Sequence, residues 1–133
     1  MKEIAKIIFH KNNKVLLQLR DDDPTIPFPG MWTLFGGGIE VKETPKECVL
    51  REVKEELSIK LNRVNFITRQ KRYESSELAK DYIFSSKLKQ NFGNLELKEG
   101  QDMQLFSKSE LKKIDLVSHY SPIIKGFLTE ISK

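Results

Sequence analysis

Residues 36–59, GGGIEVKETPKECVLREVKEELSI, join a glycine triplet to the most sharply delimited helix of the sequence. Thr44 can act as an N-cap, Pro45 suits the first helical position, and Glu47 completes a capping box. The helix is therefore expected to begin at Pro45 and to run to about Leu57. These capping residues also fix the geometry with which the preceding loop enters the helix.

On a helical wheel this segment carries an acidic sector beside an apolar one. The apolar sector, which is expected to face the core, contains Val49, Leu50, Val53 and Leu57. The acidic sector contains Glu52, Glu55 and Glu56. Carboxylates spaced three and four residues apart repel one another, and more strongly where water is excluded. Three of them at the edge of a core therefore predict a bound cation, and all-oxygen ligands favour Mg²⁺ or Mn²⁺.

The alternative for the acidic sector is a solvated helix face whose charge is offset by Lys46, Lys54 and Lys60. Two features favour a metal site instead. The glycine triplet lies immediately upstream, where the backbone can approach a ligand closely. Arg51 precedes the acidic sector and can pair with the isolated Glu43, which would fix the loop against the helix.

The same residues resemble the signature of a known family. Gly37 is followed after five residues by Glu43, and seven residues later Arg51 begins the run REVKEELSI. This spacing resembles the Nudix box of the MutT-like Nudix hydrolase family at every position but one, because Ser58 replaces the usual glycine. The order of hairpin, glycine-rich stretch, later strands and C-terminal helix resembles that family over nearly the whole chain.

The resemblance implies both a fold and a set of site residues. The implied fold is an α/β/α sandwich around a mixed β-sheet that carries the Nudix loop–helix–loop. The three glutamates of the acidic sector, Glu52, Glu55 and Glu56, are expected to bind divalent metal ions. The carbonyl oxygen of Gly36 is expected to complete a coordination shell, and Arg51 is expected to support the catalytic loop as a brace.

The implied reaction is metal-dependent hydrolysis of a diphosphate bond in a nucleoside diphosphate linked to another moiety. Metal ions neutralise phosphate charge and lower the pKa of bound water, and a carboxylate can take the proton. Glu55 is the preferred general base and Glu52 the alternative. An acidic residue from a later loop is a further alternative. Glu99 and Asp102 are favoured over Glu96 for this role. The alternative is that their turn is an ordinary solvated turn without a catalytic role.

Candidate substrates are ordinary, modified or oxidised nucleoside triphosphates, ADP-ribose-like compounds and dinucleoside polyphosphates. Arg20, at the end of a strand, could bind a phosphate of the substrate or lie at the surface. Residues 71–73 could hold a nucleotide or form an exposed strand end, and His119 is expected to be structural. Two other functions are alternatives: a non-catalytic nucleotide-sensing module on the same fold, and a nucleic-acid binder.

Outside the quoted stretch, β-rich and helical patterns alternate without repeats or linkers, which predicts one mixed α/β domain over residues 1–133. Strands are expected at residues 4–9, 15–20, 31–35, 63–73, 82–89 and 103–106. Helices are expected at residues 107–114 and 121–131, turns at residues 36–38 and 91–94, and a polar stretch at residues 74–81 between two strands. Asn12 and Asn13 tolerate positive φ and suit a hairpin turn between the first two strands.

Composition excludes several classes of protein. The 133 residues are 38% hydrophobic and 32% charged, which excludes a disordered or fibrous chain. A single cysteine excludes a disulfide framework. No apolar run reaches the roughly 18 residues that a membrane-spanning helix needs.

Charge and the N-terminus bound the partners. Residues 1–10 are typical of a first strand rather than a signal peptide, so a cytoplasmic monomer or homodimer without a membrane partner is expected. The net charge of +4 suits a small anionic nucleotide as substrate. Nucleic acid is not the expected partner, because the lysines are scattered and form no run.

Overall fold

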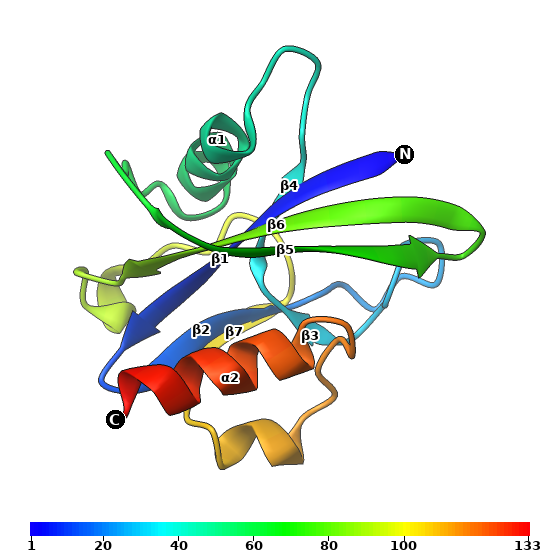
Figure 1. The fold of residues 1–133 in the computed structure, drawn as a ribbon. Coiled ribbons are helices and arrows are strands. Elements are labelled where there is room, and N and C mark those ends of the chain that lie inside the picture. Colours follow the sequence, from blue (N-terminus) through cyan, green and yellow to red (C-terminus); the bar gives the residue numbers. More distant parts are fainter.

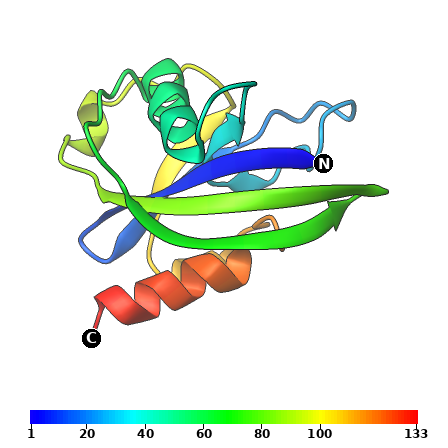
Figure 2. The ribbon, with the colours of Figure 1, turned by 45° about the horizontal axis from the view of Figure 1, so that its top comes forward.

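The structure, a computed structural model, describes residues 1–133 and contains a mixed β-sheet with an α-helix on either face (Figures 1 and 2). The strands are β1 (Lys2–Lys11), β2 (Lys14–Leu19), β3 (Trp32–Thr33), β4 (Phe35–Gly38), β5 (Asn65–Glu74), β6 (Glu77–Lys87) and β7 (Asp102–Phe106). The helices are α1 (Pro45–Leu57) and α2 (Ser121–Ile131), with 3₁₀ turns at Phe92–Asn94 and Glu110–Lys113. No helix is long and apolar enough to cross a membrane. The arrangement confirms the predicted sandwich.

β1 is the central strand, because it has partners along both edges. One edge pairs in parallel with β6 from Lys2 to His10, and β5 pairs with the far edge of β6. The other edge is shared, because Phe9–Lys11 pair with β2 whereas Ile4–Ile7 pair with β4. β2 and β4 therefore diverge from the same edge of β1, and β2 continues the sheet through β3 and β7. We call the gap between β2 and β4 the fork.

Alternating side chains of β1 enter two separate cores. The core beneath α1 includes Ala5, Ile7, Phe9, Val49 and Val53. The core beneath α2 includes Ile8, Leu17, Ile83, Ile124 and Leu128. By this alternation Lys6 lies on the α2 side with Ile8, and it is only 8% exposed. A cation therefore interrupts the apolar run of β1 from Ile4 to Phe9.

α1 begins as predicted, but its buried face differs from the helical wheel. Thr44 accepts a hydrogen bond from the N–H of Glu47 at 3.1 Å, and Glu47 accepts one from the N–H of Thr44 at 2.9 Å. Leu50 is only half-buried, whereas Cys48 and Glu56 are buried. The Sγ atom of Cys48 lies 3.5 Å from two carbonyl oxygens of β4. α1 thus turns this face toward the glycine-rich strand, which brings Cys48 and Glu56 inward.

Three segments differ from the sequence-based expectation. Residues 36–38 belong to strand β4 rather than a turn, because they pair with β1. β5 and β6 are joined by a tight turn at residues 75–76, so β6 begins at Glu77, earlier than expected. Residues 107–114 contain only the 3₁₀ turn Glu110–Lys113 instead of a longer helix. The first residues of β6 were not predicted as a strand, because they are mostly polar and only alternate residues among them are buried.

Non-glycine residues with positive φ mark two turns. Asn12 and Asn13 have φ values of 52° and 60°, which confirms the predicted hairpin turn. Ser58 ends α1 with φ 56° and ψ 30° and donates its N–H to the carbonyl oxygen of Lys54 at 3.0 Å. Ser58 therefore adopts the left-handed conformation that glycine adopts at less cost.

Replacing Ser58 by glycine is expected to raise the free energy of unfolding by about 0.5–1 kcal/mol, because glycine lacks the Cβ that disfavours this conformation. Urea denaturation at pH 7 measures the change. Ser58→Ala is the matched control and should bring no gain, since alanine keeps the Cβ atom. Equal stability of the glycine and alanine variants would contradict the assignment.

Candidate active site

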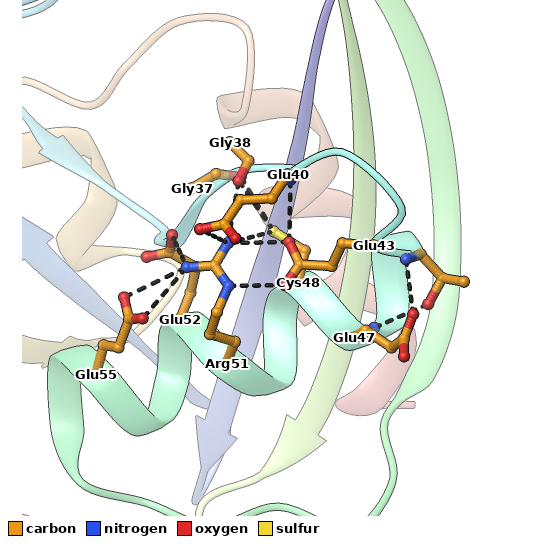
Figure 3. A network of polar contacts seen from close by, with 10 residues as sticks. Gly37, Gly38, Glu40, Glu43, Glu47, Cys48, Arg51, Glu52 and Glu55 are labelled. Carbon is orange, nitrogen blue, oxygen red and sulfur yellow. Dashed lines mark hydrogen bonds and ion pairs between the residues drawn. The ribbon is translucent and has the colours of Figure 1, made fainter.

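The guanidinium of Arg51 is the centre of a carboxylate network (Figure 3). Nε donates to Oε2 of Glu43 at 2.7 Å, and Nη2 donates to Oε1 of the same carboxylate at 3.0 Å. Nη1 donates to Oε1 of Glu52 at 3.0 Å and lies 3.3 Å from Oε2 of Glu55. Nη2 also donates to the carbonyl oxygen of Gly38 at 3.2 Å. Arg51 thus ties together α1, the loop before it and β4, and its pairing with Glu43 is the one that the sequence predicts.

The bidentate pair keeps Glu43 ionised. Only 13% of the Glu43 side chain is exposed, and the hydrogen bonds from Arg51 lower its pKa from 4.5 to about 2. Oε1 of Glu43 also accepts the N–H of Glu40 at 3.0 Å. Glu43 therefore stabilises the loop before α1 through Glu40 and joins this loop to the helix through Arg51.

Glu52 lies against the backbone of β4. A Cβ atom at Gly37 would lie 2.5 Å from Oε1 of Glu52, so glycine is needed there to leave space for the carboxylate. Burial raises the pKa of Glu52, and its hydrogen bond with Arg51 acts in the opposite direction. Glu55 shares the same guanidinium nitrogen but has 55% of its side chain exposed.

Glu56 enters the fork instead of joining this network, and it is 2% exposed. Oε1 accepts the N–H of Gly36 at 3.0 Å, and Oε2 accepts Nε2 of Gln18 at 3.3 Å. Burial raises the pKa of Glu56 well above its usual range, whereas the ammonium of Lys6 lowers it. Gly36 has φ 136°, and a Cβ there would lie 2.1 Å from a carbonyl oxygen of β1, so this position also requires glycine.

The three glutamates of the acidic sector do not meet at one point, because two share Arg51 whereas Glu56 bonds to Gly36. Their chemistry nevertheless fits a divalent cation. All donor atoms are oxygens, which Mg²⁺ and Mn²⁺ prefer. Burial disfavours the ionised forms of Glu52 and Glu56, so a cation would offset that cost. The missing side chain of Gly37 lets the Glu52 carboxylate lie against β4, the strand that carries the Gly36 carbonyl oxygen.

A pocket of about 240 Å³ opens at the fork, and we call it the carboxylate pocket. Its lining includes Gln18, Arg20, Gly36, Glu56 and Glu99. The charge of Glu99 contributes to the raised pKa of both Glu52 and Glu56. Asp102 is not part of this lining, and its Oδ1 accepts the N–H of Met103 at 2.8 Å at the start of β7. The structure therefore brings Glu99, but not Asp102, to the buried carboxylate.

A second pocket, of about 220 Å³, lies toward α2, and we call it the Tyr120 pocket. Its lining includes Lys6, Arg20, Phe28, Gly36, Arg72 and Tyr120. His119 also lines it, and burial lowers the pKa of that imidazole to about 4, so it is neutral at pH 7. Arg20 and Gly36 line both pockets, which therefore adjoin at these two residues.

The structure gives Arg20 a definite place and adds residues that the sequence does not single out. Arg20 lies where the two pockets adjoin, and its Nε donates to the carbonyl oxygen of Pro27 at 2.8 Å. Lys6, Asp81 and Tyr120 are the additions. Lys6 has a local signal, a charge within an apolar run, whereas Asp81 and Tyr120 meet at 3.1 Å across 39 positions of sequence and have none.

A family model described as "NUDIX domain" matches residues 2–127. The chain belongs to the NUDIX family. Among solved structures, a MutT protein from Methanosarcina mazei is similar with a TM-score of 0.83 and 19% identity, covering 99% of this chain and 96% of that one. This likeness confirms the fold.

The curated relatives differ in how much of their length they share with this chain. CTP pyrophosphohydrolase of Escherichia coli is 23% identical over 128 residues, which is 96% of this chain and 92% of the relative. ADP-ribose pyrophosphatase of Methanocaldococcus jannaschii is 44% identical over 52 residues, which is 39% of this chain and 29% of the relative. Three of the curated relatives match over only 29% to 38% of their own length.

Replacing Arg51 by alanine is expected to lower the free energy of unfolding by about 2 kcal/mol at pH 7, because two partly buried carboxylates lose their charged donor. The pKa of Glu43 is depressed in the folded state, so this stabilisation is present above pH 4.5 and is lost as pH falls toward 2. Urea denaturation of both proteins at pH 7, 4.5 and 2.5 measures the difference.

Lys54→Ala is the matched control, because Lys54 is an exposed cation on the same helix. It should change stability by no more than about 0.5 kcal/mol. A difference between wild type and Arg51→Ala that stays constant down to pH 2.5 would contradict the assigned ion pair.

Proposed function

We propose that this NUDIX protein hydrolyses a diphosphate bond in a nucleoside diphosphate linked to another moiety, with Mg²⁺ or Mn²⁺ as cofactor. The meeting of two unlike pockets at Arg20 and Gly36 is the observation that supports this most strongly. One pocket carries buried and partly exposed carboxylates, and the other carries cations and aromatic rings. A diphosphate at the junction would have its nucleoside in the Tyr120 pocket and its scissile bond beside Glu56.

Glu52, Glu55 and Glu56, with the carbonyl oxygen of Gly36, are the proposed metal ligands. Bound metal ions would neutralise phosphate charge and supply an activated water. Arg51 is the proposed positioning residue, because its hydrogen bonds hold the carboxylates and the preceding loop. Its guanidinium is occupied by these contacts, so it is not expected to bind the substrate.

Arg20 is the proposed phosphate-binding residue. Its Nε is used by a backbone carbonyl oxygen, which leaves the Nη groups of the guanidinium for phosphate oxygens where the pockets adjoin. Its position between the pockets favours this role over a purely surface one.

Glu55 is the preferred general base. Its side chain is 55% exposed, so water reaches it, whereas Glu52 is 16% exposed and wedged against β4. Glu52 is the alternative, and Glu99 is the candidate from a later loop because it lines the carboxylate pocket. Asp102 is less suited, because its carboxylate accepts a hydrogen bond from the strand that carries it.

The names of the relatives support a nucleotide as the substrate. One is called a CTP pyrophosphohydrolase and another an ADP-ribose pyrophosphatase, and both named substrates contain a phosphoanhydride bond next to a nucleoside. A panel of nucleoside triphosphates, ADP-ribose and a dinucleoside polyphosphate therefore covers the proposed substrate class.

Glu56→Gln is expected to lower turnover at least about a hundredfold, because a neutral amide is a poor metal ligand. Glutamine keeps one oxygen to accept the N–H of Gly36, so the fold should persist. Phosphate-product release across the panel, with Mg²⁺ and with a chelator, measures turnover. Circular dichroism checks the fold.

The matched control is Glu130→Gln, because Glu130 is an exposed glutamate of α2 that lines neither pocket. Near-native turnover of Glu56→Gln would refute the proposed site. A wild-type protein that binds members of the panel and hydrolyses none would favour the nucleotide-sensing alternative.

A further inference from the structure

The Tyr120 pocket has an excess of cations that the hydrolysis itself does not require. Lys2, Lys6, Arg20 and Arg72 line it, and Glu74 is the one carboxylate in its lining. Lys6 is 8% exposed and the Arg72 side chain is 11% exposed. These two cations are therefore held inside the protein, where a charge is costly unless carboxylates or hydrogen bonds compensate it.

Lys6 has hydrogen-bond donors without partners. Its Nζ donates to the carbonyl oxygen of Leu34 at 3.3 Å, whereas the carboxylates of Glu56 and Asp81 act on it through their charge. An ammonium has three N–H groups, so two of them remain for a ligand. Nζ lies 6.0 Å from the centre of the Tyr120 ring, which borders the pocket.

Arg72 is held in place by a buried carboxylate. Nε and Nη2 donate to Asp81 at 2.7 and 3.1 Å, and Nη1 donates to Glu74 at 3.2 Å. A guanidinium has five N–H groups, so two remain. Its central carbon lies 5.8 Å from the centre of the Tyr120 ring. Lys6 and Arg72 thus offer their free donors beside the same ring.

The acceptors near this ring are already used. Asp81 also accepts Nε2 of Gln70 at 3.0 Å and the hydroxyl of Tyr120 at 3.1 Å. Glu74 accepts from both Lys2 and Arg72. A ligand in this pocket therefore meets free donors and few free acceptors. The His119 ring packs edge to face against both Phe28 and Tyr120. Aromatic rings of this kind suit contact with a planar base.

We propose that Lys6 and Arg72 make the Tyr120 pocket select guanine or cytosine over adenine. Guanine presents O6 and N7, and cytosine presents O2 and N3, as neighbouring acceptors that match such donors. The amino group of adenine is a donor beside N1 and beside N7, and the carboxylates nearest the Tyr120 ring are already engaged by other donors. This inference rests on the proposed function, because it assigns the base of the same nucleotide.

Lys6→Met tests the proposal, because methionine is of similar length and is apolar. We measure kcat and KM for GTP, CTP, UTP and ATP. Wild type is expected to prefer GTP and CTP over ATP, and Lys6→Met should reduce that preference about tenfold, mainly through KM. Lys6→Arg should restore part of it, since arginine again supplies donors.

Lys11→Met is the matched control, because Lys11 is a lysine of the same strand that lines neither pocket. It should leave the preference unchanged. A merely structural role of Lys6 would alter the melting temperature and all four substrates together, without changing their ranking.

Two outcomes overturn the proposal. An equal loss for all four nucleotides would place Lys6 at the phosphates, which they share, and unchanged values of kcat/KM for all four would remove Lys6 from recognition. If wild type hydrolyses none of the four, hydrolysis as proposed fails for these substrates. The base preference is then read from their binding by calorimetry with Ca²⁺ in place of Mg²⁺. ATP binding as tightly as GTP and CTP would overturn the proposal in that case too.

Discussion

The division of one edge of β1 between β2 and β4 is the constraint on which the site depends. Where the two strands diverge, backbone groups lose strand partners and must be satisfied by side chains. The carbonyl oxygen of Leu34 accepts from Nζ of Lys6 and Nε2 of Gln18 at 3.3 and 3.4 Å, and the N–H of Gly36 donates to Glu56. A buried carboxylate and a buried ammonium at this point are thus consequences of the sheet topology.

Opposite charges make this concentration of ionised groups tolerable. A buried charge is costly unless a counter-charge or hydrogen bonds compensate it. Arg51 compensates Glu43 and Glu52, whereas Glu56 has two hydrogen bonds and the neighbouring charge of Lys6. The compensation of Glu56 is the weaker, because burial still raises its pKa. The negative charge of Glu56 is therefore incompletely compensated within the protein, and a bound cation would complete the compensation.

The sequence predicts those features that are local in the chain. The capping box of α1 and the pairing of Arg51 with Glu43 involve neighbouring residues, and both are present. The inward turn of Glu56 was not predicted, because a helical wheel does not say which neighbour approaches the helix. The Tyr120 pocket was not predicted either, for a similar reason. Its lining includes residues of β1, β4 and β5 and the residues before α2, whose proximity only the complete sheet defines.

Lys6 and Gly36 are register partners on β1 and β4, and this pairing places the proposed base-recognition residue next to the backbone of the carboxylate pocket. The backbone of Gly36 serves the carboxylate pocket, whereas the side chain of Lys6 belongs to the α2 side of the sheet. A substitution at Lys6 is therefore expected to leave the Arg51 network on α1 in place and to reach the carboxylates through the charge that Lys6 exerts on Glu56. A substitution at Gly36 would disturb both pockets, because Gly36 lines both of them and any Cβ atom there would clash with the backbone of β1. Under the proposed roles, residues on the α2 side of the sheet set which base is bound, while the α1 side keeps the geometry of its carboxylates.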